Sequence, residues 1–165
     1  MRAKLKIAVL AGGLVAIATV AYAAVTATPV FVQTPNRGIV QFLQGTDSAG
    51  TYKTLYTGGA NGSKCTGMYI TSNDAAAHLV TIQLVNSSVK YGGMAISTGT
   101  TTPGFASGAP AISAMAPVNW PGLPTDSDGN PYFYLAGTGD TIQATFGTGL
   151  TASTVINIVA ICADF

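Results

Sequence analysis

The chain has 165 residues, enough for one domain with a hydrophobic core and too few for two domains of ordinary size. Charged residues make up only 8% of the sequence, 48% is hydrophobic, and there is no glutamate. This composition argues against a helical bundle, whose amphipathic faces need charge, and against disorder, which needs a low apolar content. The formal net charge of +1 offers no patch for a phosphate backbone, so we expect no nucleic-acid partner.

The first 23 residues form a separate segment. A short basic start precedes an uncharged apolar run over residues 7–23. Ala21 and Ala23 place small side chains at the −3 and −1 positions of a cut, the layout of a secretory signal peptide. The run is also close to the shortest length that crosses a hydrocarbon layer of about 30 Å. We therefore predict a signal peptide over residues 1–23, with an uncleaved membrane anchor as the alternative. We expect contact with a membrane only through this segment, and only if it is not cleaved.

Two cysteines, Cys65 and Cys162, fit an exported protein. No Cys-x-x-Cys or Cys/His cluster is present to hold zinc. In an oxidising compartment the pair is a disulfide candidate, and the chain-entropy treatment gives such a closure about 4–5 kcal/mol. The alternative is that both are small buried hydrophobic residues.

After residue 24, short apolar–polar alternations separated by turn residues predict β-strands. The run over residues 89–97 is the predicted partner of the run over residues 78–85. The run over residues 154–162 is apolar on both faces apart from Asn157, so we expect it in the middle of a sheet, covered on both sides. The predicted strands span residues 38–44, 51–57, 65–71, 78–85, 89–97, 111–116 (weakly), 132–136, 140–146 and 154–162.

Residues 98–131 interrupt this pattern, because six of the eight prolines lie there. Proline withholds ladder donors and favours an irregular path, so we expect a long Pro/Gly-rich surface excursion. Residues 24–165 as a whole are predicted to form a single antiparallel β-sandwich or jelly roll. A β-solenoid is the weaker alternative, since no fixed period recurs.

Catalytic motifs are missing from the sequence. There is no Gly-x-Ser-x-Gly elbow, no His-Glu-x-x-His and no phosphate-binding loop. The acid–base groups are six aspartates and one histidine, His78, which at a strand start is expected at the rim of the domain. One histidine among many serines and aspartates defines no specific triad. We predict a protein that is not an enzyme and needs no cofactor.

One turn offers weak metal candidates. Asp126, Asp128 and Asn130 present oxygen atoms at alternate positions, as a calcium loop does. Pro131 stands where an EF-hand has glycine, and Gly137 stands where it has glutamate, so an ordinary turn is the favoured interpretation.

The aromatic residues are scattered over the predicted strands. They are expected to be core and interface residues, with a carbohydrate-binding platform as the alternative. They are Tyr52, Tyr56, Tyr69, Tyr91, Trp120, Tyr132 and Tyr134.

The order of turns and strands in one part of the chain resembles a known group of proteins. A Thr-Pro-Asn-Arg-Gly stretch at residues 34–38 precedes the Gly/Asn turn of residues 57–63, the polar turn of residues 72–74 and the strand of residues 78–84. Over residues 34–97 this is similar to small virion proteins encoded by phages and prophages, which are β-sandwich capsid-decoration or head-associated subunits. The apolar N-terminal segment departs from that pattern, because capsid parts are normally assembled in the cytoplasm.

Two functions remain open. The first is a non-catalytic structural subunit that packs on copies of itself, or on a shell or surface lattice, through tyrosine and tryptophan anchors. The second is an exported binding module or adhesin that recognises a glycan or a cell surface, with calcium at Asp126 and Asp128. The leader predicts an exported location (periplasmic, extracellular or cell surface), with the virion as the alternative. The first function predicts a homo-oligomer, whereas the second predicts a monomer.

Overall fold

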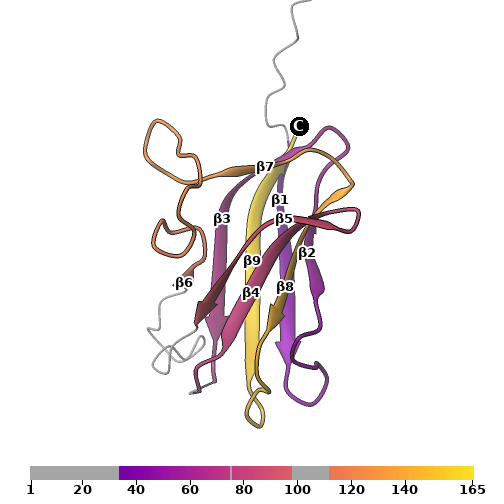
Figure 1. Cartoon of the computed structure of the whole chain (residues 1–165), viewed down its shortest axis with the longest axis vertical. Coiled ribbons are helices and arrows are strands. Elements are labelled where there is room, and N and C mark those ends of the chain that lie inside the picture. The colour runs from indigo at the N-terminus through magenta and orange to yellow at the C-terminus, as the bar shows by residue number, and fades with distance from the viewer. Residues whose placement is uncertain (1–33, 75, 98–111) are drawn as a thin grey trace, which may run out of the picture. The chain divides into compact units, whose positions relative to one another are not determined.

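The computed structural model describes residues 34–74, 76–97 and 112–165, and these form nine β-strands in two antiparallel sheets (Figure 1). Within these ranges no residue is helical, so the all-β prediction is confirmed for them. We call the five-stranded sheet A and the four-stranded sheet B. The strands are β1 (Thr34–Leu43), β2 (Lys53–Thr57), β3 (Ser63–Ser72), β4 (Leu79–Asn86), β5 (Val89–Ser97), β6 (Ile112–Ser113), β7 (Phe133–Leu135), β8 (Asp140–Phe146) and β9 (Val155–Asp164).

The strand pairs are nested within one another. β1 pairs with β9, β2 with β8, β3 with β6 and β7, and β4 with β5, all antiparallel. Two more pairings, β3 with β9 and β4 with β8, complete the sheets. Sheet A therefore runs β1-β9-β3-β6, with β7 also on β3, and sheet B runs β2-β8-β4-β5. The predicted pairing of residues 78–85 with 89–97 is confirmed by the β4–β5 register.

The core lies between the inner faces of the two sheets. In β8 and β9 every second side chain points inward, as the alternation of the sequence requires. Phe42 of sheet A meets Phe146 of sheet B edge-to-face, with ring centroids 5.1 Å apart. Burial of side chains of this size stabilises the fold by about 1.5–3 kcal/mol each. The largest fully buried apolar residues are Phe42, Phe146, Met68, Ile70, Ile82, Met115, Leu135, Ile142, Ile156, Ile158 and Val80.

Two β-bulges change which residues face inward. A register shift between Thr54 and Tyr56 makes Leu55 and Tyr56 both buried, although they are adjacent in sequence. A second shift between Cys65 and Gly67 leaves the intervening Thr66 exposed, so that the inward positions of β3 change from odd to even numbers. Simple alternation predicts neither change.

Two expectations are wrong in part. β9 is central, between β1 and β3, but its outer face is not covered, because Ile161 remains 43% exposed. The segment after β5 was expected on the surface, yet Ala114 and Met115 are buried, and Trp120 packs against the ring of Phe133 at 5.5 Å. A short apolar stretch in a proline-rich segment is enough to fill the open end of a two-sheet core.

Some predictions fall outside the described residues. They are the signal peptide or anchor at residues 1–23, its small residues Ala21 and Ala23, and the first part of the excursion, residues 98–111. Among the described residues, no helix has the length and apolar character to cross a membrane.

Candidate functional site

His78 is buried rather than at the rim of the domain. Its side chain is 2% exposed, and its Nε2 lies 2.8 Å from Oδ2 of Asp74. Its Nδ1 lies 3.1 Å from the hydroxyl of Thr148. The ring therefore joins the β3–β4 loop to the β8–β9 loop. The expectation of a rim position was wrong. The hydrogen bond to Asp74, four residues upstream, offsets the desolvation cost of burying the imidazole.

Asp74 is the centre of this buried cluster. It accepts hydrogen bonds from the N–H and hydroxyl of Thr151, the hydroxyl of Thr154 and the N–H of Ala76, besides its contact with His78. Burial alone raises the pKa of Asp74, but these donors, with Thr151 first, outweigh it and hold the pKa well below the ordinary value. A carboxylate with this many donors fixes two loops and has no lone pair directed at solvent.

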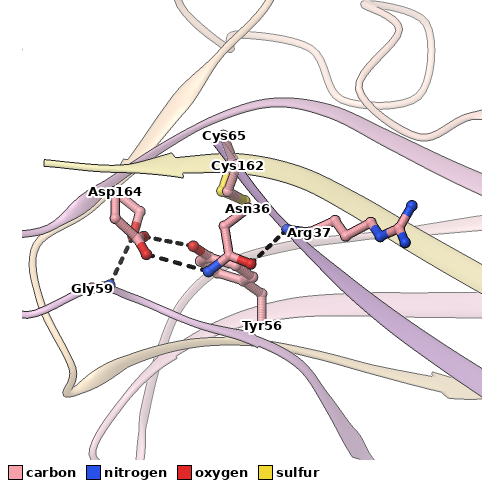
Figure 2. Close-up of a disulfide and its surroundings, with 8 residues drawn as sticks. Asn36, Arg37, Tyr56, Gly59, Cys65, Cys162 and Asp164 are labelled. Atoms are coloured by element: carbon pink, nitrogen blue, oxygen red, sulfur yellow. Dashed lines mark hydrogen bonds between the residues drawn. A yellow bond between two sulfur atoms is a disulfide. The ribbon is translucent and has the colours of Figure 1, made fainter. Parts of the chain in front are cut away.

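Asp164 makes a second internal cluster, at the end of β9 (Figure 2). It accepts hydrogen bonds of 2.6 Å from the hydroxyls of Ser63 and Tyr56 and one of 3.3 Å from the amide of Asn36. These donors, Ser63 first, lower the pKa of Asp164. Because Tyr56 belongs to sheet B and the others to sheet A, this carboxylate ties the two sheets together.

Two further aspartates hold loops in the same way. Asp140 is buried and accepts hydrogen bonds from the side-chain amide of Asn86 and from the N–H of Ala136. Asp47 accepts the N–H of Leu43 at 2.7 Å and pairs with Lys53 at 2.6 Å. Most of the aspartates that were acid–base candidates from the sequence therefore have a structural role.

Cys65 and Cys162 are joined by a disulfide between the neighbouring strands β3 and β9 (Figure 2). The two residues are direct partners in the strand register, with Cα atoms 4.0 Å apart. Both side chains are buried in the core cluster. The bond lies beside the Asp164 cluster, and together they fix the same end of sheet A.

The candidate metal turn is held by its own backbone. Asp126 Oδ1 accepts the N–H groups of Asp128 and Asn130 at 3.0 and 2.8 Å, and a Thr125–Pro131 bridge closes the loop. The Asn130 N–H is the largest influence that lowers the pKa of Asp126. Nowhere in the described ranges do three or more His, Cys, Asp or Glu side chains gather as metal ligands would.

The outer faces of the two sheets differ in chemistry. In sheet A the outward side chains include aliphatic and aromatic residues on four strands, in registered rows such as Ile39–Val159–Tyr69 and Arg37–Ile161. A depression of about 440 Å³ lies there, lined by Pro35, Asn36, Arg37 and Ile161. The exposed large hydrophobic residues of this face are Ile39, Leu43, Tyr69, Tyr134 and Ile161.

The outer face of sheet B is polar at its centre. Its middle strands pair Thr81 with Thr145 and Gln83 with Gln143, and the two glutamine side chains hydrogen-bond at 2.8 Å. The exposed apolar residues on this side lie on the outermost strand, at the start of β4 or directly before β2; they are Val89, Tyr91, Leu79 and Tyr52. The outer face of sheet A also carries a hydrogen-bonded polar pair, Gln41 with Asn157 at 2.9 Å, but Tyr69 and Ile161 expose apolar surface on its two central strands.

An aromatic group borders the sheet A face. Tyr134 of β7 packs on Tyr132 and Phe165, at centroid distances of 5.3 and 6.0 Å, and Lys64 lies 4.4 Å from the Tyr132 ring. Tyr56 and Trp120, in contrast, pack into or against the core. The seven predicted aromatics are thus divided between core and separate surfaces, and they do not form one platform.

Sequence reasoning missed the roles of Asp74, Asp140 and Asp164. None of them stands in a recognisable motif, and their donors come from residues up to 128 positions away. The available signal was indirect: in a chain with six aspartates and few cations, each carboxylate is expected to have a specific partner.

No protein-family model matches this sequence, and no curated protein matches it. Among solved structures, the chain is similar to the capsid asymmetric unit of cyanophage Pam1, with 14% identity, 87% of this chain and 95% of that chain covered, and a TM-score of 0.40. It is also similar to the virus-like particle of the extra small virus of the freshwater prawn Macrobrachium rosenbergii, with 11% identity, coverage of 84% and 85%, and a TM-score of 0.31.

Proposed function

We propose that this protein is a non-catalytic structural subunit that acts by packing against other subunits, either in a virion shell or in an exported surface layer. The observation that carries the proposal is the nested strand pairing. When the two arms of one long antiparallel hairpin roll up, the first strand pairs with the last and the middle strands pair with each other. This is the arrangement of a jelly roll, an architecture used by viral capsid domains, lectins and cupins.

Among the proteins that use this architecture, the side-chain chemistry favours a capsid-like subunit over a ligand-binding lectin or cupin. A lectin or cupin directs carboxylates or histidines toward a ligand or metal. Here Asp74 and Asp164 accept hydrogen bonds from donors of the same chain, and His78 Nε2 contacts the Asp74 carboxylate, so these groups fix loops. The fold is stiffened internally, and an apolar outer sheet is left for contact with another molecule.

Export remains part of the proposal. The buried Cys65–Cys162 disulfide supports it, because such bonds persist in oxidising compartments and on virion surfaces. Intact mass of the natural product tests this point. A chain that starts at Ala24 supports export, and an intact N-terminus with a reduced cysteine pair contradicts it.

The experiment for the proposed function is sedimentation velocity of the full chain over a hundredfold range of concentration, followed by electron microscopy. We expect concentration-dependent growth into particles or sheets of regular geometry. A monomer at every concentration, with a melting temperature that rises on addition of a glycan, overturns the proposal in favour of the binding module.

A further inference from the structure

We propose that the outer face of sheet A packs against the same face of a second copy of this chain, around a two-fold axis that runs parallel to β9. The inference rests on the proposed function and specifies one of its contacts. Apolar side chains extend across this face from Ile39 on β1, through Ile161 on β9, to Tyr134 on β7. Exposed apolar side chains that gather on one face of a domain mark an interaction site.

The size of the face matches a weak contact that is repeated in a lattice. The three ten-residue strands and the five residues of β6 and β7, at about 3.3 Å per residue and about 4.8 Å between strands, cover roughly 550 Å². A stable interface of standard size buries about 800 Å² per partner. The contact is therefore expected to be concentration-dependent on its own and to be reinforced by other contacts in an assembly.

Charge distribution points to a second copy as the partner. The Arg37 guanidinium lies on β1 at one side of the face, and neither Arg37 nor Asp128 has an ion-pair partner among the described residues. Asp128 belongs to the turn at the opposite side. The Thr125–Pro131 bridge closes this turn, and Lys64 of β3 lies 4.4 Å from the ring of the next residue, Tyr132. One molecule thus carries an unpaired cation and an unpaired anion on opposite sides of one apolar face.

A two-fold axis that is parallel to β9 and passes between β9 and β3 brings these two charges together. Rotation about that axis exchanges the β1 side with the β7 side while the strands of the two sheets stay aligned, as in face-to-face sheet packing. Arg37 then faces the partner subunit's Asp128, and the pair forms twice in each contact. Ile161, on β9 beside the axis, then lies in the apolar centre of the contact.

The test compares the full chain with charge and apolar variants by sedimentation velocity. Ile161→Lys is expected to raise the dimer dissociation constant by tenfold or more, because a charge enters the apolar centre on both copies. The matched control is Leu79→Lys, at a residue that is 50% exposed on sheet B against 43% for Ile161, and it is expected to change the constant less than twofold. Arg37→Asp and Asp128→Arg are each expected to weaken association about five- to tenfold at low salt, and the double exchange is expected to restore it.

The outcomes separate this inference from the proposed function. If the chain assembles and neither Ile161→Lys nor the charge variants change association, the function stands and this face is not the contact. If Ile161→Lys lowers the melting temperature with no change in association, residues of the same chain outside the described ranges cover the face, and the inference is overturned. A double exchange that fails to rescue Arg37→Asp and Asp128→Arg overturns the two-fold arrangement. A chain that never assembles contradicts the proposed function itself.

Discussion

Reduction of the Cys65–Cys162 disulfide is predicted to remove a large part of the stability of the domain. The bond joins residues 97 positions apart, and a loop of that length restricts the unfolded chain by about 4.7 kcal/mol in the chain-entropy treatment. A domain of this size has an unfolding entropy near 2.1 cal/mol/K per residue, so the loss corresponds to a fall of about 15 °C in melting temperature. Strain in the native state would make the effect smaller.

The assay is thermal and urea unfolding of the oxidised and reduced chain, followed by circular dichroism. Reduction isolates the effect of the cross-link, because both thiols stay in the buried positions that the sulfurs occupy now. Cys65→Ala with Cys162→Ala is a second perturbation, which adds the loss of buried sulfur and is expected to cost at least as much. A difference below about 1 kcal/mol between oxidised and reduced chains would refute the reasoning, since the closure of the long loop would then contribute little.

Three further predictions concern Asp74, Gly38 and Asp126. Asp74→Asn is expected to cost about 3 kcal/mol near neutral pH in urea unfolding, because the new amide places donors against donors. The depressed pKa of Asp74 contributes stability that is complete above the unfolded value near 3.9 and is lost as the pH falls toward the folded value. The cost of the substitution should therefore shrink below about pH 4, and a cost that grows there contradicts the assignment. Gly38→Ala places a Cβ 1.8 Å from a backbone oxygen of β2 and is expected to lower stability by about 2–4 kcal/mol, whereas Gly149→Ala, with open space around it, should change stability by less than about 0.5 kcal/mol. Asp126→Asn keeps an oxygen that accepts the hydrogen bonds of the turn, so the variant should fold. Calorimetry should show that calcium does not change the melting temperature of the parent chain or of the variant. A calcium-dependent rise in the parent chain that is lost in the variant would reveal a metal site.

The strands could be predicted where alternation is uninterrupted. β5 and β8 begin and end where the sequence places them, because each alternates between inward and outward residues and is bounded by turn residues. β1 was predicted from Gly38 but begins at Thr34, since its first residues pair with the end of β9. Pairing with a distant strand extends a strand beyond its own hydrophobic pattern.

Which residues of β2 and β3 face the core could not be predicted. The bulges at Leu55 and Thr66 each add one residue to a strand, and everything after the bulge changes face. As a result Tyr56 enters the core, where its hydroxyl reaches Asp164. The hydrogen bond between Tyr56 and Asp164 cannot be predicted from the sequence around either residue.

The candidate site was predicted least well. Residues 125–131 form a turn, as their local Asp-Gly and Asn-Pro chemistry predicts. His78 was misplaced because its burial depends on Asp74 and on threonines of the β8–β9 loop, about 70 to 80 residues away. The apolar outer face of sheet A depends on which strands become neighbours, and sequence alternation does not contain that information.

Hydroxyl-radical footprinting of dilute and concentrated samples tests the central claim most directly. Tyr69 and Tyr134 report the outer face of sheet A, and Tyr91, with comparable exposure, reports sheet B. The account predicts that oxidation of Tyr69 and Tyr134 slows severalfold as the chain assembles while oxidation of Tyr91 keeps its rate. Equal rates at all concentrations, or protection of Tyr91 alone, would contradict a subunit that works through this face.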